Sequence, residues 1–167
     1  HALIVGWLGL YEAATPGVEA ADNATVRLDL DNDPQPDALL RIDETCGGQS
    51  RIDDDDYVEG APELIVEIAA STASYDLHDK KRAYRRNGVK EYIVWAVADQ
   101  QVYWFSLQNG QYIELESEDG IIKSCIFPGL NLNIHALLKK DLATVLATLQ
   151  SGLGRERHQQ FVQTLAQ

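Results

Sequence analysis

The chain has 167 residues, enough for one domain with a substantial core, and its 45% hydrophobic and 24% charged residues are ordinary for a globular protein. Its net charge of −12 argues against a protein whose whole surface attracts nucleic acid. The longest apolar run, Ala2 to Leu10, is too short to span a bilayer, so we expect no membrane segment. The two cysteines lack the spacing of a disulfide framework or zinc site, so we expect a cytoplasmic protein.

The first half of the chain predicts one helix followed by several strands. Residues 1–17 have the apolar spacing of a helix that ends at the Pro16-Gly17 pair. Because the chain opens on this helix and contains no methionine, we expect the start of the protein to lie upstream. Strands are predicted at 24–30, 37–42 and 62–70, with an acidic loop at 43–60 that has room for a short hairpin.

The second half begins with a helix, continues with strands and ends in helices. A helix is predicted over 77–87 because its pattern stops at Gly88, a common residue just after a helix C-terminus. Further strands are predicted at 91–97, 101–107, 111–116 and 120–127, and helices at 134–150 and 155–166. This order predicts an α/β domain in which a mixed sheet is flanked by helices.

The charges are unevenly distributed along the chain. Residues 1–60 carry 14 acids and 3 bases, whereas residues 61–167 carry 12 acids and 11 bases. Six of those bases lie between residues 80 and 90, a stretch that contains no acid. The sequence therefore predicts one basic helix in an otherwise acidic protein.

Two carboxylates lie on the predicted strand 62–70. Because alternate side chains of a strand share a face, one face of this strand is wholly apolar and the other carries Glu63 and Glu67. Glu67 stands mid-strand among apolar neighbours, where a charge is costly unless it is paired or bound to a metal. Glu63 stands at the strand start, where we expect it to be solvated or to bind a ligand through water.

Three features of the sequence point to one chemistry. Asp37 follows Pro36 at the head of a predicted strand, and Glu67 lies in the next major strand. On the helix that follows, Asp76 and Lys80 are four residues apart and share a face. Carboxylates that meet near strand ends form the hard-oxygen site that magnesium and manganese prefer, and a lysine beside them suits metal-assisted hydrolysis of a phosphodiester.

These residues resemble the signature of the restriction-endonuclease-like superfamily, which is Pro-Asp, then Asp or Glu, any residue and Lys. More narrowly, the runs APELIVEIAAST and YDLHDKKRAYRRNGVKEYIVW resemble the Uma-two family of bacterial endonucleases. That family has a strand ending in Glu, a Ser/Thr-rich turn, then Asp, Lys and Tyr at four-residue steps, and Gly-Val before an aromatic strand. The resemblance covers most of residues 1–138 and implies a restriction-endonuclease-like fold.

The resemblance implies a role for each matching residue. It makes Asp37 and Glu67 ligands of Mg²⁺ or Mn²⁺, and it makes Lys80 the catalytic lysine, because alanine stands two residues after the glutamate. Asp76 would support Lys80 or the metal, and Glu63 stands where the family often has Asp. DNA is the implied substrate, and a homodimer is among the implied assemblies.

Each assignment has a structural alternative. Glu67 is otherwise one half of a structural ion pair, and Asp76, with Asp79 three residues later, is otherwise a helix N-cap. Asp37 follows a proline in a turn, where aspartate is common for local backbone reasons. Lys80 is otherwise an ordinary surface residue. The basic side chains of Lys81, Arg82, Arg85 and Arg86 either contact DNA phosphates or form a solvated helix face.

Together these features predict a divalent-metal-dependent endonuclease, a hydrolase that acts on DNA. Residues 1–138 are its predicted restriction-endonuclease-like domain, and residues 139–167 are a predicted C-terminal helical extension. The alternative is a non-catalytic regulatory or assembly module on the same fold, which the −12 charge and the displaced lysine favour. The two hypotheses differ in geometry, because a catalytic site needs Asp37, Glu67 and Lys80 to converge.

Overall fold

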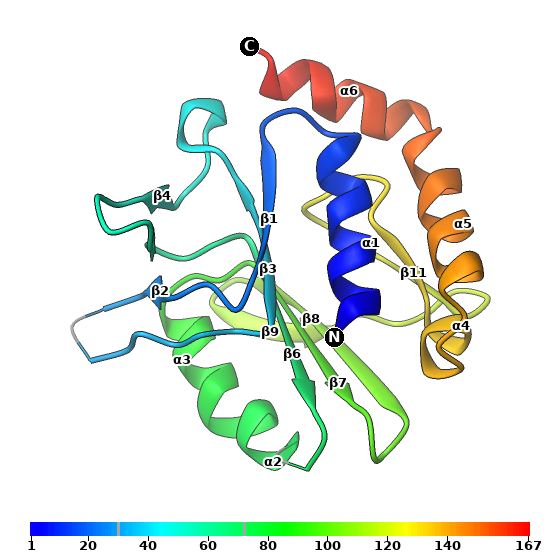
Figure 1. Ribbon diagram of the computed structural model, residues 1–167, viewed down its shortest axis with the longest axis horizontal. Coiled ribbons are helices and arrows are strands. Elements are labelled where there is room, and N and C mark those ends of the chain that lie inside the picture. Colours follow the sequence, from blue (N-terminus) through cyan, green and yellow to red (C-terminus); the bar gives the residue numbers. More distant parts are fainter. Residues whose placement is uncertain (30, 72) are drawn as a thin grey trace.

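A central sheet with helices on both faces forms the body of the protein, as the computed structural model shows for residues 1–29, 31–71 and 73–167 (Figure 1). Within these residues, six strands form the main sheet in the order β1-β3-β6-β7-β8-β9. Their bounds are β1 Val18–Asp22, β3 Ala38–Ile42, β6 Leu64–Ala69, β7 Glu91–Ala96, β8 Gln101–Gln108 and β9 Gln111–Glu114. Strands β6 and β7 run parallel and the other neighbours antiparallel, so the predicted mixed sheet is confirmed.

Smaller elements surround this sheet. Short strands form two further sheets, with β2 Val26–Arg27, β5 Val58–Glu59 and β4 Arg51–Ile52 in one and β10 Ile121–Lys123 and β11 Asn131–Asn133 in the other. The helical elements are α1 Ala2–Ala13, η1 Glu44–Cys46, α2 Ala73–Tyr75, the π-helical turn η2 Asp76–Lys80, α3 Lys81–Arg86, α4 Ile134–Leu138, α5 Leu142–Leu153 and α6 Glu156–Leu165. None of the described helices has the length and apolar character needed to cross a bilayer.

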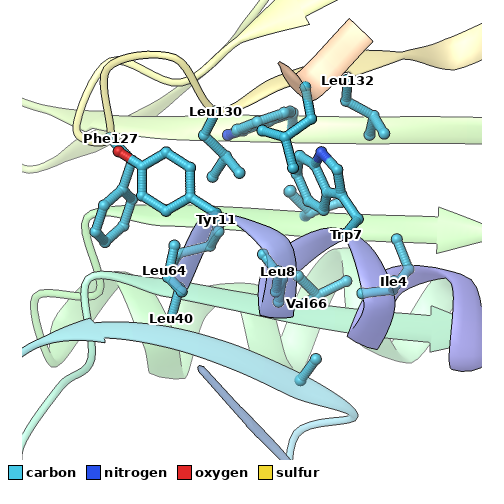
Figure 2. Close-up of a cluster of buried hydrophobic side chains, with 14 of the residues drawn as sticks. Ile4, Trp7, Leu8, Tyr11, Leu40, Leu64, Val66, Phe127, Leu130 and Leu132 are labelled. Atoms are coloured by element: carbon cyan, nitrogen blue, oxygen red, sulfur yellow. The ribbon is translucent and has the colours of Figure 1, made fainter. Parts of the chain in front are cut away.

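Helix α1 covers one face of the sheet. Its buried side chains, Ile4, Trp7, Leu8 and Tyr11, recur at the three- and four-residue spacing of one helix face. Figure 2 shows them between Leu40, Leu64 and Val66 of the sheet on one side and Phe127, Leu130 and Leu132 on the other. Each fully buried aliphatic side chain contributes about 1.5–3 kcal/mol, so this layer is a major source of stability.

The C-terminal helices extend the same core. Val145 and Leu149 of α5 and Leu165 of α6 belong to the hydrophobic cluster around α1. The buried ring of His158 joins α6 to the end of α1, with Nε2 2.9 Å from Thr15 Oγ1. Residues on both sides of the predicted boundary at 138 therefore share one core, and the division into two parts stays a prediction.

The opposite face of the sheet is covered by α3 and carries a second, more polar core. Its buried members include Leu39, Ile65, Tyr84, Val89, Tyr92 and Phe105. Tyr84 of α3 packs edge-on against Tyr92 of β7 with ring centroids 5.0 Å apart. Glu67 belongs to this face because it is two residues from Ile65 along β6.

Several elements differ from the sequence-based expectations. Strands β1 and β11 were not predicted, because each is short and lacks a strict alternation of buried and exposed residues. The predicted strand 24–30 contracts to β2, and its position 30 lies outside the described residues. The predicted helix 134–150 divides into α4 and α5 at Lys140, whose φ of 57° is left-handed, and Asp141 then caps α5 by accepting from Thr144 N.

The predicted strand 120–127 is also shorter, because residues 124–127 turn to reach a buried carboxylate. Glu91 Oε1 accepts from Cys125 N at 2.6 Å, and Oε2 accepts from Ser124 Oγ at 2.7 Å and Trp104 Nε1 at 3.2 Å. Burial raises the pKa of Glu91 to about 7, since these hydrogen bonds oppose only part of the cost of desolvation. Glu91 thus ties the loop before β11 to the centre of the sheet.

The raised pKa of Glu91 predicts a specific pH dependence of stability. The folded state holds this proton more tightly than the unfolded state, so the contribution is fully present below about pH 4.5 and is lost as the pH rises through about 7. Relative to Glu91→Gln, the free energy of unfolding of the wild type should fall by on the order of 3 kcal/mol over this window. Urea denaturation of both proteins across the pH range measures the difference, and parallel profiles would contradict it.

The close approach of α5 to the turn before β11 predicts a second stability effect. A Cβ at Gly152 would lie 2.3 Å from Gly129 O, a contact that only a backbone shift relieves. Gly152→Ala should therefore cost about 1–3 kcal/mol. Gly6→Ala in α1 is the control, because nothing lies within 4 Å of its Cβ and the better helix propensity should stabilise by up to about 1 kcal/mol. Equal effects of the two substitutions in denaturant unfolding would refute the clash.

Candidate active site

Asp37 directly precedes β3, and Glu67 lies in β6, the strand that pairs with β3. The antiparallel register pairs Ala38 with Val66, so one further step places Asp37 opposite Glu67 on the face covered by α3. Asp37 Oδ2 accepts a hydrogen bond of 2.6 Å from the backbone N–H of Ile68. Strand pairing therefore places two acids that are thirty residues apart in the sequence at adjacent positions of neighbouring strands.

The Glu67 side chain is buried and depends on α3 for its partners. The residue is 3% exposed, and its Oε1 accepts from Tyr84 OH at 2.7 Å. Lys80 Nζ lies 3.2 Å from the same oxygen. This carboxylate is thus stabilised by one hydroxyl donor and one ammonium group from the neighbouring helix.

A π-helical turn places Asp76 and Lys80 beside Glu67. Lys80 Nζ lies 3.0 Å from Asp76 Oδ1, although that buried oxygen has no hydrogen bond of regular geometry among the described residues. Tyr92 OH donates to the Asp76 carbonyl oxygen at 2.9 Å, which fixes the turn to β7. Turns of this type, with bonds five residues apart, occur often at functional sites.

The alternatives considered for Asp76 and Lys80 can now be assessed. The helical segment begins at Ala73, three residues before Asp76, so the N-cap alternative for Asp76 is wrong. The Lys80 side chain is 29% exposed and contacts two carboxylates, so Lys80 is not an ordinary surface residue. The roles of both in catalysis stay predictions.

Burial and charge oppose each other in this cluster. Burial raises the pKa of Glu67 and Asp76 raises it further, whereas the Tyr84 hydroxyl and Lys80 pull it down. Burial alone would lower the pKa of Lys80, but the attraction of Glu67 and Asp76 outweighs it and the pKa of Lys80 is raised. Two carboxylates thus share one ammonium group, and Lys80 stays protonated at neutral pH.

A pocket of about 600 Å³ opens onto this cluster. Lys80 and Tyr84 line it from the helix side, and the loop that follows β2 forms the opposite wall. Arg82 and Arg86 stand along the same rim. The pocket gives solvent a route to the exposed part of the Lys80 side chain.

Glu63 does not belong to this cluster. It is 0% exposed, and its two oxygens accept from Ile42 N at 2.8 Å and Gln49 N at 3.0 Å. The expectation that Glu63 is solvated at the strand start is therefore wrong, because the 42–49 segment folds over it. Its contacts are with backbone N–H groups at the opposite end of β6 from Glu67.

The four basic residues of the predicted nucleic-acid surface point in two directions. Lys81 lies over the Phe105 ring, with Nζ 3.8 Å from its centroid, and burial lowers the pKa of Lys81. Arg85 Nη1 donates to Gly110 O at 3.1 Å, so both side chains contact the β8–β9 hairpin. Arg82 and Arg86 are exposed at the pocket rim.

Two contacts of the site were not anticipated from the sequence. Tyr92 appeared only as part of an apolar strand, and its bond to Asp76 depends on a π-helical turn that no spacing rule announces. His1 Nδ1 lies 3.8 Å from Asp37 Oδ1 and His1 Nε2 lies 3.7 Å from Asp22 Oδ2. The His1 contacts join residues more than twenty positions apart and the Tyr92 bond spans sixteen, separations that local patterns do not connect.

The donor set can be tested against the divalent ion that the sequence implies. Across residues 1–29, 31–71 and 73–167, no group of three or more His, Cys, Asp or Glu side chains is arranged to hold a metal ion. Magnesium, however, is commonly held by one or two carboxylates together with water and substrate phosphates. Asp37 and Glu67 supply two hard carboxylate oxygens of the kind used in that mode of binding, and Asp76 Oδ1, held only by its ion pair with Lys80, is a third.

Comparisons with known proteins identify the family of this chain and a solved structure of similar fold. The model of the Uma2 family, described as "Putative restriction endonuclease", matches residues 1–135. The chain belongs to the Uma2 family. A search of curated proteins found no match. Among solved structures, the chain is similar to "a putative nuclease belonging to DUF820" from Anabaena variabilis, with a TM-score of 0.58 and 14% identity over 83% of this chain and 77% of that one. At this identity the likeness shows a shared fold.

The hydrogen bond from Tyr84 to Glu67 leads to a testable prediction. Tyr84→Phe removes a donor that lowers the pKa of Glu67, so this pKa should rise further, and stability at neutral pH should fall by about 1.5–3 kcal/mol. Carboxyl-carbon NMR titration measures the pKa. Tyr112→Phe is the matched control, because it loses a 2.7 Å bond to Val89 O but leaves Glu67 untouched. A Glu67 titration unchanged by Tyr84→Phe would contradict the role of this bond.

Proposed function

We propose that this Uma2-family chain is an endonuclease that hydrolyses phosphodiester bonds of DNA with the help of Mg²⁺ or Mn²⁺. The observation that carries the proposal is the position of Lys80 Nζ, 3.2 Å from Glu67 Oε1 and 3.0 Å from Asp76 Oδ1. A cation held between two buried carboxylates suits the chemistry of phosphoryl transfer.

Asp37 and Glu67 are the proposed ligands of the ion. Their oxygens belong to neighbouring strands, so the sheet itself sets their separation. When bound, the ion would supply Lewis-acid stabilisation of the charge that develops on the phosphate oxygens. The excess of carboxylates over cations in the cluster favours the uptake of positive charge at this place.

Lys80 is the proposed catalytic lysine. Because the neighbouring carboxylates raise its pKa, it acts as a cation that orients the attacking water and stabilises negative charge. It does not act as a general base, since a base must give up its proton near the working pH. Asp76 and Tyr84 position Lys80 and Glu67 for these roles through the contacts described above.

The rim of the pocket supplies the proposed contact with substrate. Arg82 and Arg86 are exposed beside Lys80, and exposed arginines bind backbone phosphates. Lys81 and Arg85 are held by the β8–β9 hairpin, so we expect a smaller contribution from them. The homodimer and the cytoplasmic location that the resemblance implies stay predictions.

One observation favours the alternative of a non-catalytic module. Glu67 already has a hydroxyl and an ammonium partner, so its charge is balanced without a metal. A buried network of this kind can serve structural specificity alone. On this alternative Lys80 is a structural cation, and loss of a divalent ion has no effect on the protein.

A cleavage assay separates the two functions. Supercoiled and single-stranded DNA would be incubated with the protein in Mg²⁺, in Mn²⁺ and in chelator. Metal-dependent cutting by the wild type should fall by at least about 100-fold in Glu67→Ala and Lys80→Ala. Arg51→Ala is the matched surface control, because Arg51 pairs with Glu59 in the β4–β5 hairpin. Cutting retained by both site variants, or absent from the wild type, would remove the proposed function.

A further inference from the structure

We propose that the groove between the β10–β11 hairpin and helices α5 and α6 is a second contact surface for the phosphate backbone of DNA. The choice of DNA as its occupant rests on the proposed function, whereas the groove itself is a feature of the fold. It has a volume of about 1060 Å³. In Figure 1 helix α5 lies on the α1 side of the sheet, opposite α3 and the candidate active site.

The groove carries a local excess of positive charge. Lys123, Arg155 and Arg157 line it together with a single acid, Glu156. The three basic side chains belong to exposed residues, and none forms an ion pair within the described part of the chain. Unpaired cations on both walls of one groove favour an anionic occupant.

This charge contrasts with that of the rest of the molecule. Residues 121–167 contain five bases and two acids, although the whole chain has a net charge of −12. The acids are concentrated elsewhere, above all in residues 1–60, which carry 14 of them. The overall negative charge therefore does not prevent an anion from binding at the C-terminal helices.

The neutral lining of the groove also suits phosphates. Thr148 and Ser151 stand three residues apart along α5 and contribute hydroxyl groups to the groove, whereas the hydroxyl of Thr144 donates to Asp141. Hydroxyl and basic side chains are the usual donors to DNA phosphate oxygens. At the base of the groove, Gly129 and Gly152 allow the turn and the helix to approach so closely that a Cβ on either meets backbone atoms.

The same lining argues against an acidic protein as the occupant. Protein interfaces gain most of their affinity from a few buried aromatic or arginine anchors seated in desolvated pockets. The residues that line this groove include no aromatic side chain, and its cations are exposed at an open surface. A flexible or duplex polyanion held by backbone contacts fits this arrangement better than a folded partner.

Helix α5 lies beyond residues 1–135, the part of the chain that the family model matches. One wall of the groove, the β10–β11 hairpin, therefore lies inside the matched region, and the other wall lies outside it. We infer that the C-terminal helices add substrate affinity to the family fold without contributing to the chemistry.

Two matched double variants test this surface. Arg155→Glu/Arg157→Glu and Lys139→Glu/Lys140→Glu change the net charge equally, but Lys139 and Lys140 do not line the groove. Fluorescence anisotropy with labelled duplex DNA in chelator, where the substrate stays intact, measures binding at several salt concentrations. The groove variant should bind roughly tenfold more weakly at low salt, and its slope of log K against log salt should be shallower by about 1.8. The control variant should stay close to the wild type.

Several other outcomes of the binding experiment would overturn the inference. Equal losses in both double variants would mean that net charge alone governs binding, and no loss in either would mean that DNA does not use the groove. Competition by poly-glutamate at lower concentration than by DNA would assign the groove to acidic polypeptides. A parallel cleavage assay keeps the two proposals apart, because the groove variant retains Asp37, Glu67 and Lys80. If DNA binding depends on the groove but the wild type does not cleave, only the nuclease proposal fails. If the wild type cleaves and the groove variant binds DNA normally, only the groove proposal fails.

Discussion

The burial of a carboxylate in the middle of β6 is the constraint on which the arrangement of the α3 face depends. Taking the charge of Glu67 out of water costs several kcal/mol unless hydrogen bonds and an opposite charge offset it. The backbone of β6 does not supply this compensation, because it pairs with β3 over Leu64–Val66 and with β7 throughout, and the N–H group of Ile68 donates to Asp37. The helix that crosses this face must therefore deliver both Tyr84 and Lys80 to one oxygen. The π-helical turn and its bond to Tyr92 follow from that requirement, since they set where Lys80 leaves the helix.

The buried carboxylates on and beside the sheet differ in whether their hydrogen-bond donors are fixed in packed structure or belong to a side chain that can move. Glu63 accepts from backbone N–H groups, and Glu91 accepts from a backbone N–H group, a serine and a tryptophan within packed structure. These donors are fixed, so the two residues act as internal ties between loops and strands. Glu67 and Asp76 instead share a lysine that lines an open pocket and has rotatable bonds. An acid whose partner can move is suited to exchange that partner for a substrate or ion.

The two faces of the sheet divide structural and chemical tasks. The α1 face is filled by large apolar side chains and continues into α5 and α6, so it supplies most of the burial that stabilises the domain (Figure 2). That stability allows the α3 face to hold polar groups whose burial is unfavourable in isolation. The C-terminal helices also carry Arg155 and Arg157, two of the three cations that line the groove, on their outer surface. The proposed chemistry and the proposed second contact with DNA therefore lie on opposite sides of one scaffold.

The sequence by itself determined the mixed α/β fold and which segments form the central strands, because apolar alternation is a local property of the chain. It also determined the family, because the spacing of Asp76, Lys80 and Tyr84 is likewise local. It also indicated that Glu67 needs a partner, since a mid-strand acid among apolar residues is costly. Only the tertiary structure decided which partners it has. Strand pairing places Asp37 and Glu67 at adjacent positions of neighbouring strands, and a π-helical turn brings Lys80 to Glu67 and Asp76. The superficially similar Glu63 is instead enclosed by residues 42–49. The short strands β1 and β11 and the break at Lys140 were likewise decided by long-range pairing and packing, which leave little trace in local pattern. Contacts between residues far apart in the chain depend on how whole elements dock, and that is settled by the summed burial of the core.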